Sequence, residues 1–190
     1  TAQTLRFDKT IQHVKSFHSS LGRSQELDAV FQIEIRNTAP DHVAGYGNRG
    51  ALLEIGVHVL DLVRFLTGEE VQTVLCTMDH IPPIEPERMV SIHLTATGGT
   101  ICHIEITRVV GERAGRAIWV GSQGRVAADW MRRRICVEMS SGEKTSDIDI
   151  PPSLTVLDTL AAFLQAVNDG TPMPITGEDG CRAVEIAEAC

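Results

Sequence analysis

The sequence predicts a single α+β domain: a large, mostly antiparallel open sheet with helices packed on one face. Three observations support this fold class. The 190 residues are 43% apolar, which is enough for one hydrophobic core. Several extended, β-favouring segments follow one another between residues 71 and 150. Helical patterns stand before and after this run, an order typical of α+β domains.

The first third of the chain predicts a helix, a strand and a second helix. Residues 11–21 have the spacing of an amphipathic helix, which Gly22 would end. Residues 27–36 favour a strand and lead into a glycine-rich loop. Residues 50–66 are apolar almost all round, so they predict a buried helix that ends before Gly68.

The middle of the chain predicts the sheet. Strands are expected over residues 71–78, 89–97, 100–109, 115–120, 125–130, 135–139 and 145–150. Gly98-Gly99 favours a two-residue hairpin turn, which would place Leu94 opposite His103. In that register Ile92 and Ile104 face opposite sides of the sheet. We therefore expect helices to cover one face and a second subunit to cover the other.

The last part of the chain predicts two helices after Pro151-Pro152. The first covers residues 154–168. Its apolar stripe consists of Leu157, Leu160, Ala161, Leu164 and Val167. The second follows Gly177 and extends to the last residue, Cys190.

Composition and charge argue against several classes of function. The net charge is −8 and the one basic cluster, residues 132–134, is isolated, so no nucleic-acid partner is expected. No apolar run is long enough to span a bilayer, and no signal peptide opens the chain, so no membrane partner is expected. The five cysteines form no CxxC pair, which favours neither a zinc site nor a disulfide framework. A reducing, cytoplasmic location fits this cysteine pattern best.

Three polar residues interrupt the apolar helix predicted over residues 50–66. Glu54, His58 and Asp61 lie at i, i+4 and i+7, on one stripe of that helix. A buried acid or imidazole is costly unless it is paired or used. The stripe therefore marks a candidate catalytic site.

The glycine loop before this helix matches the pattern G-x-G-x-x-G at residues 45–50. In a dinucleotide-binding motif a strand leads directly into the first glycine, and the phosphates meet the N-terminus of the next helix. Here the preceding strand ends near Arg36 and residues 38–41 intervene, although Glu70 lies about twenty residues further on. We expect no cofactor phosphate site at this loop.

Three passages resemble, in order, the C-terminal half of the Gfo/Idh/MocA oxidoreductases, the glucose–fructose oxidoreductase and inositol dehydrogenase types. Residues 6–8, Arg-Phe-Asp, with the helix and Leu-Gly that follow, are similar to the family's R-R-F-D passage at the domain junction. Residues 49–62 resemble its G-G-x-x-x-D-x-x-x-H-x-x-D signature. Residues 174–180, Pro-Ile-Thr-Gly-Glu-Asp-Gly, resemble its closing P-V-T-G-E-D-G.

The resemblance implies a fold and a cofactor. Residues 1–190 would be one substrate-binding and dimerisation domain of the dihydrodipicolinate reductase-like C-terminal type. NAD or NADP would be bound mainly by an N-terminal Rossmann domain, which also supplies a catalytic lysine and is absent from these residues. The substrate would be a sugar, inositol or related polyol with a secondary alcohol to oxidise. The free face of the sheet would form a homo-oligomer.

The resemblance also implies roles for individual residues. Oxidation of a secondary alcohol needs a base within reach of the hydroxyl, and histidine suits that role. His58 matches the signature histidine and is the expected catalytic base. Glu54 replaces the signature aspartate, a change that moves the carboxylate by about an ångström. It would contact the substrate or orient His58. Asp61 matches the later aspartate, for which we expect a structural role, pairing with His58 or Arg64, or a contact with substrate.

Two further positions are candidates for substrate contact. Arg36 and Asn37 stand where some inositol dehydrogenase-like members have Arg-Asp. Leu5 takes the place of the first arginine in R-R-F-D, which removes a possible substrate donor. Arg6 is then expected to anchor the domain junction.

Two alternatives remain at this point. The glutamate at position 54 and the lack of a cofactor domain also fit a stand-alone, non-catalytic carbohydrate-binding or dimerisation module. Glu54 and His58 have the i, i+4 spacing of metal ligands, but no second helix offers a matching pair. We therefore predict no metal site. The full-length protein is expected to be an NAD(P)-dependent dehydrogenase and the isolated chain to be inactive.

Overall fold

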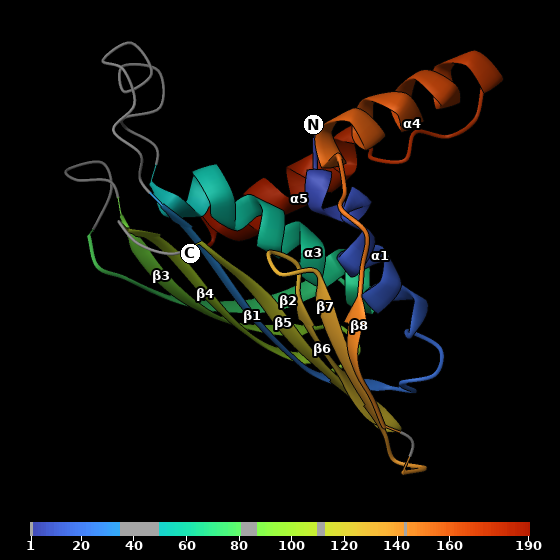
Figure 1. Ribbon diagram of the computed structural model, residues 1–190. Helices are drawn as coiled ribbons and strands as arrows, with labels where there is room; N and C mark the ends of the chain where they lie inside the picture. The colour runs from blue at the N-terminus through green and yellow to red at the C-terminus, as the bar shows by residue number, and fades with distance from the viewer. Residues whose placement is uncertain (1, 35–49, 81–86, 110–112, 143) are drawn as a thin grey trace.

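The computed structural model describes residues 2–34, 50–80, 87–109, 113–142 and 144–190. Eight strands form one sheet in the order β2-β3-β4-β1-β5-β6-β7-β8 (Figure 1). The strands are β1 (Ser24–Glu34), β2 (Val71–Met78), β3 (Met89–Ala96), β4 (Ile101–Val109), β5 (Ala114–Gly121), β6 (Gly124–Asp129), β7 (Arg134–Met139) and β8 (Lys144–Asp149). Only the pair β1–β4 is parallel, which confirms the predicted mostly antiparallel sheet.

The helices lie on one side of this sheet (Figure 1). They are the 3-10 turn η1 (Thr4–Phe7), α1 (Lys9–Ser16), the π-helical turn η2 (Leu52–Gly56), α3 (Val57–Thr67), α4 (Thr155–Asp169) and α5 (Gly177–Glu188). The predicted α+β architecture, with helices on one face, is therefore confirmed. None of the helices in the described ranges is long and apolar enough to span a membrane.

The helix α1 is shorter than its predicted extent. The Asp8 carboxylate caps it by accepting hydrogen bonds from the N–H groups of Thr10 and Ile11, at 2.8 and 3.3 Å. The helix ends at Ser16, and turns continue the chain to Gly22, which has a φ of 72°. The glycine thus provides the left-handed residue expected of it, but several residues after the helix has ended.

The β3–β4 hairpin has a register one residue away from the predicted one. Leu94 pairs with Cys102 and not with His103, because the loop is one residue longer than a two-residue turn. Its last glycine has a φ of 90°, as is typical of three-residue hairpin loops. A shift of one residue moves a strand's side chains to the other face. Ile92 and Ile104 are therefore opposite one another, both fully buried, and the predicted two-sided apolar hairpin is wrong.

The core lies between the sheet and the helices α1, α3 and α5. The opposite side of the sheet, which no described helix covers, is called the open face here. It carries polar side chains together with exposed apolar ones, namely Val30, Leu75, Met89, Ile101 and Ile118. The expectation of apolar side chains on the second face is thus met, but by residues other than those of the hairpin core.

The helix α4 extends away from the sheet (Figure 1). Of the stripe predicted for it, Leu157, Leu160, Leu164 and Val167 are between 52% and 59% exposed. Only Ala166 of this helix is buried. The helix contacts η1, and Lys9 holds its entry through hydrogen bonds to Ser153 and Pro152.

Candidate active site

The buried helix predicted over residues 50–66 is present as η2 followed by α3, and Gly68 ends it with a φ of 74°. Val59, Leu60 and Val63 are fully buried against the sheet, so the helix is rigidly positioned. Glu54 lies in the π-helical turn η2, whereas His58 and Asp61 lie in α3. A π-helical turn holds more residues than an α-helical turn, so Glu54 is rotated away from the line of the other two. The stripe of three polar residues is therefore only partly continuous.

His58 is half-buried in α3 and faces the N-terminal segment. Its Nδ1 lies 2.9 Å from Oε1 of Gln3, a side chain that is itself buried. Because the amide oxygen accepts, Nδ1 carries the proton, and Nε2 has no hydrogen-bond partner among the described residues. Burial lowers the pKa of His58 below its ordinary value, although the charge of Asp61 acts to raise it. The imidazole is thus a neutral base near neutral pH.

Glu54 contacts a partner on the sheet. Its carboxylate lies 2.5 Å from Nη1 of Arg108 on β4, and the two side chains are 28% and 27% exposed. Gln3 and not Glu54 orients the imidazole of His58. The structure therefore places a paired carboxylate and a neutral imidazole on the same helix, directed toward different neighbours.

An ionic cluster around Asp61 connects the three passages that resemble the family, residues 6–8, 49–62 and 174–180. The Asp61 side chain is 1% exposed and accepts two hydrogen bonds from Arg6, at 2.8 and 2.6 Å. Arg6 also donates to Asp179 of α5 at 2.9 Å, and Arg64 lies 4.0 Å from Asp61. Arg6 thus anchors η1 to α3 and α5, and its role at a domain junction stays a prediction. With both carboxylate oxygens held by Arg6, the structural role expected of Asp61 is favoured over substrate contact.

Arg36 and Asn37 lie outside the described residues, and their contact with substrate stays a prediction. Within the described part of the chain, Glu54 and His58 belong to no group of three metal-ligating side chains. The structure therefore does not support the metal alternative for this pair.

The N-terminus of the buried helix is occupied by the carboxylate of Glu87. One oxygen accepts from the N–H of Leu52 at 2.8 Å, and the backbone oxygen of Glu87 accepts from Ala51. A helix N-terminus is the place where a dinucleotide motif holds phosphate. Here a buried carboxylate fills it and would repel a second anion. The start of this helix, which the structure describes from Gly50 on, thus already has an anionic partner.

Reasoning from sequence missed three partners of the site, namely Gln3, Glu87 and Arg108. Each lies more than thirty positions from the helix residue that it contacts. No spacing rule connects residues so far apart, and glutamine, glutamate and arginine are ordinary surface types. A burial signal was also lacking, since none of the three stands in an apolar run.

The family comparison gives one match. The family model described as the GFO/IDH/MocA C-terminal domain matches residues 8–127. The comparison with curated proteins gave no match.

Solved structures with the same fold include several oxidoreductases. The UDP-N-acetylglucosamine 3-dehydrogenase from Acidithiobacillus ferrooxidans is 19% identical, with a TM-score of 0.83. An oxidoreductase from Agrobacterium radiobacter, in complex with NAD+, L-tartaric acid and magnesium, is 19% identical with a TM-score of 0.77. A putative myo-inositol dehydrogenase from Sinorhizobium meliloti is 21% identical with a TM-score of 0.76. Each covers 98% of this chain, which spans only 58%, 59% and 60% of theirs.

Proposed function

Because this chain belongs to the Gfo/Idh/MocA family, whose C-terminal domain it matches, we propose that it is the substrate-binding half of an NAD(P)-dependent oxidoreductase. The reaction is the oxidation of a secondary alcohol of a sugar, inositol or related polyol. The observation that carries the proposal is His58, a half-buried imidazole whose Nδ1 is held by Gln3 and whose Nε2 is free to accept a proton.

The chemistry of this chain is proton removal. As the carbon–hydrogen bond of the alcohol breaks, the hydroxyl proton passes to Nε2 of His58, which becomes an imidazolium. The charge of Asp61 on the same helix stabilises that cation. Arg108 and Glu54 provide a donor and an acceptor for neighbouring hydroxyls of the substrate. NAD or NADP, bound mainly by another domain, would accept the hydride.

Steady-state kinetics of the full-length protein test this proposal. We expect activity with NAD or NADP on a panel of sugars and inositols, and none from residues 1–190 alone. Replacing the base in His58→Gln is expected to lower kcat by about 10²- to 10⁴-fold, the range of general base catalysis. The matched control is His13→Gln on α1, which is expected to leave kcat unchanged. Full activity of His58→Gln would contradict the assignment.

A specific observation favours the alternative of a non-catalytic carbohydrate-binding module. Glu54 stands where the family has an aspartate, and its carboxylate is already paired with Arg108. The dehydrogenase and the binding module are distinguished by whether a bound sugar is turned over. Sugar binding by calorimetry, together with no turnover by the full-length protein under either cofactor, would favour the binding module.

We also propose that the open face forms a homo-oligomer. Exposed apolar side chains on this face include Leu75, Ile101 and Ile118, at 69%, 51% and 41% exposure. Apolar side chains gathered on one face are typical of association surfaces. Ile118→Arg should convert the oligomer to a monomer in analytical ultracentrifugation, whereas Val184→Arg, on α5, should not. If both variants kept the molar mass of the parent assembly, the open face would not be the oligomer interface.

A further inference from the structure

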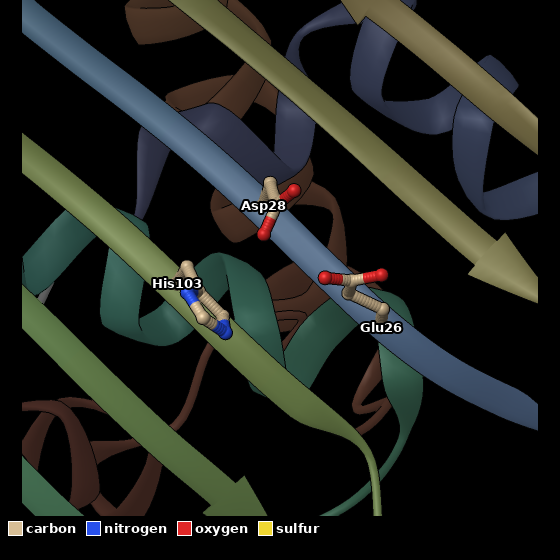
Figure 2. A group of neighbouring side chains, drawn as sticks. All are labelled: Glu26, Asp28 and His103. Atoms are coloured by element: carbon tan, nitrogen blue, oxygen red, sulfur yellow. The ribbon is translucent and has the colours of Figure 1, made fainter.

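Three metal-ligating side chains meet on the open face, away from His58. Glu26 and Asp28 are two residues apart on β1, so their side chains point to the same side of the sheet. His103 stands directly opposite Asp28 on the parallel neighbour β4. Figure 2 shows the three side chains on the near side of the strands, with the helices behind.

The geometry of this group is close enough for a shared ligand. One ligand atom from each residue, two carboxylate oxygens and one imidazole nitrogen, lies within 4.8 Å of the other two. The next strand extends the row, because His93 on β3 pairs with His103 and their ring centroids are 4.6 Å apart. Contact with a second ring limits the orientations open to the His103 imidazole.

The charge pattern distinguishes these two carboxylates from others on the same face. Glu105 accepts a hydrogen bond from Ser91 at 2.6 Å, and Glu138 pairs with Arg125 at 2.6 Å. Within the described ranges, neither the Glu26 nor the Asp28 carboxylate has a hydrogen bond or an ion pair to a protein group, although their backbones pair with β4 and β5. Two adjacent anions without a cation repel one another. A bound cation would offset that repulsion.

We propose that Glu26, Asp28 and His103 bind one divalent first-row transition metal ion. Two carboxylates and one imidazole match the donor preferences of ions such as Zn²⁺ and Mn²⁺, whereas Mg²⁺ prefers oxygen ligands only. Three protein ligands leave positions for a further ligand. Because Ile101 and Ile118 stand beside Glu26 and Asp28, that ligand would come from water or from the partner subunit in the oligomer proposed above. The ion is independent of the proposed hydride chemistry, because the site lies on the opposite face of the sheet from the helix that carries His58.

Calorimetric titration with Zn²⁺ tests the site directly. The protein is the native full-length form, purified without an affinity tag and stripped of metal with a chelator. A Cys76→Ser, Cys190→Ser background removes two thiols that contact one another and could bind zinc themselves. We expect one Zn²⁺ per chain and no measurable binding of Mg²⁺ at the same concentration. Absence of Zn²⁺ binding would overturn the proposal.

Variants then assign the ligands. Asp28→Asn and His103→Gln are each expected to weaken Zn²⁺ binding by at least about tenfold, since even residues that only support a ligand contribute that much. Glu105→Gln is the matched control, a carboxylate on the same strand and face, and should bind as the parent does. Circular dichroism confirms that each variant is folded. Equal affinity for His103→Gln and the parent would show that zinc binds elsewhere and would refute the site.

Discussion

At the scale of single residues, the protonation of His58 links the site to stability. Burial lowers its pKa below the ordinary value of 6.5, so folding favours the neutral imidazole and the unfolded chain binds the proton more readily. The stability that this group contributes is therefore present above pH 6.5 and is lost as pH falls through that value toward the folded pKa.

Urea unfolding between pH 5 and pH 8 measures this linkage. We expect the free energy of unfolding to fall on the acid side of about pH 6.5 in the parent and to change less in His58→Gln, which has no titrating ring. Gly177→Ala, which removes no titrating group, serves as the control and should keep the parent's slope. A pH profile that is identical for His58→Gln and the parent would show that the His58 pKa is not lowered.

Gly50 is required by the carboxylate that caps the buried helix. A Cβ at this position would lie 1.7 Å from Oε2 of Glu87, so that carboxylate would have to move away from the N–H of Leu52. We expect Gly50→Ala to lower the free energy of unfolding by about 1–3 kcal/mol, the cost of a buried group left without its partner. Thermal and urea unfolding measure the loss.

The control for Gly50 is another glycine next to a helix start. Gly177 has open space where a Cβ would stand. Gly177→Ala should therefore be neutral or more stable by up to about 1 kcal/mol, because alanine restricts the unfolded chain. If both alanine variants behaved alike, the contact between Gly50 and Glu87 would not be what makes glycine necessary.

At the scale of elements, one ionic cluster connects η1, α3 and α5. The hydrogen bonds from Thr176 and Arg6 lower the pKa of Asp179 to about 2, against burial, which raises it. Thr176 and Asp179 also form the capping box that begins α5. The same residue thus starts a helix and holds Arg6, so the last helix is positioned by the first segment of the chain.

Removing the Arg6 guanidinium from this cluster should strongly destabilise the fold. Arg6→Met takes both hydrogen bonds from the carboxylate of Asp61, which is 1% exposed, and leaves it only the more distant Arg64. We expect the free energy of unfolding to fall by about 3–5 kcal/mol. The matched control is Arg182→Met, since Arg182 is 49% exposed and pairs with Glu178 and Glu185. An exposed pair contributes about 0–1 kcal/mol. Urea unfolding at pH 7 gives both values.

A second variant separates charge from packing at Arg6. Adding Asp61→Asn to Arg6→Met removes the unpaired buried charge and should recover part of the lost stability. Recovery would identify the buried carboxylate as the cause. If the double variant were as unstable as the sum of the two single variants, packing and not charge would explain the effect of Arg6.

At the scale of the whole molecule, α4 carries a row of exposed apolar side chains. Leu157, Phe163 and Leu164 are 59%, 48% and 58% exposed on a helix that barely contacts the rest of the described structure. The first described residues of the chain lie beside this helix (Figure 1). If this chain is the substrate-binding half of a longer oxidoreductase, as proposed above, this surface of α4 is where the domain that binds NAD or NADP would dock.

The double variant Leu157→Lys, Leu164→Lys tests this docking in the full-length protein. The free energy of unfolding of this domain should change by no more than about 0.5 kcal/mol, as for other exposed substitutions. Dehydrogenase activity should fall, and the radius of gyration of the full-length protein should rise because the two domains separate. Val184→Lys, 40% exposed on α5, is the control for adding charge. Unchanged activity and scattering would exclude α4 as the interface.

The sequence by itself determined the order and type of the elements. Period-two and apolar patterns are local, so the strand of residues 71–78 and the buried helix that ends at Gly68 could be predicted closely. The family motifs likewise identified His58 as the candidate base. The register of the β3–β4 hairpin could not be predicted, because a loop of two residues and one of three contain the same two glycines.

Only the tertiary structure decided which residues work together. Gln3 contacts His58 although the two lie 55 positions apart in the sequence. Glu54 pairs with Arg108 and not with the imidazole, and Asp61 pairs with Arg6. The metal-ligating group on the open face depends on β1 lying parallel to β4, a pairing between segments about 75 residues apart. Contacts of this kind are set by packing between elements, which no local pattern in the sequence records, and packing therefore decides the chemistry that each side chain can perform.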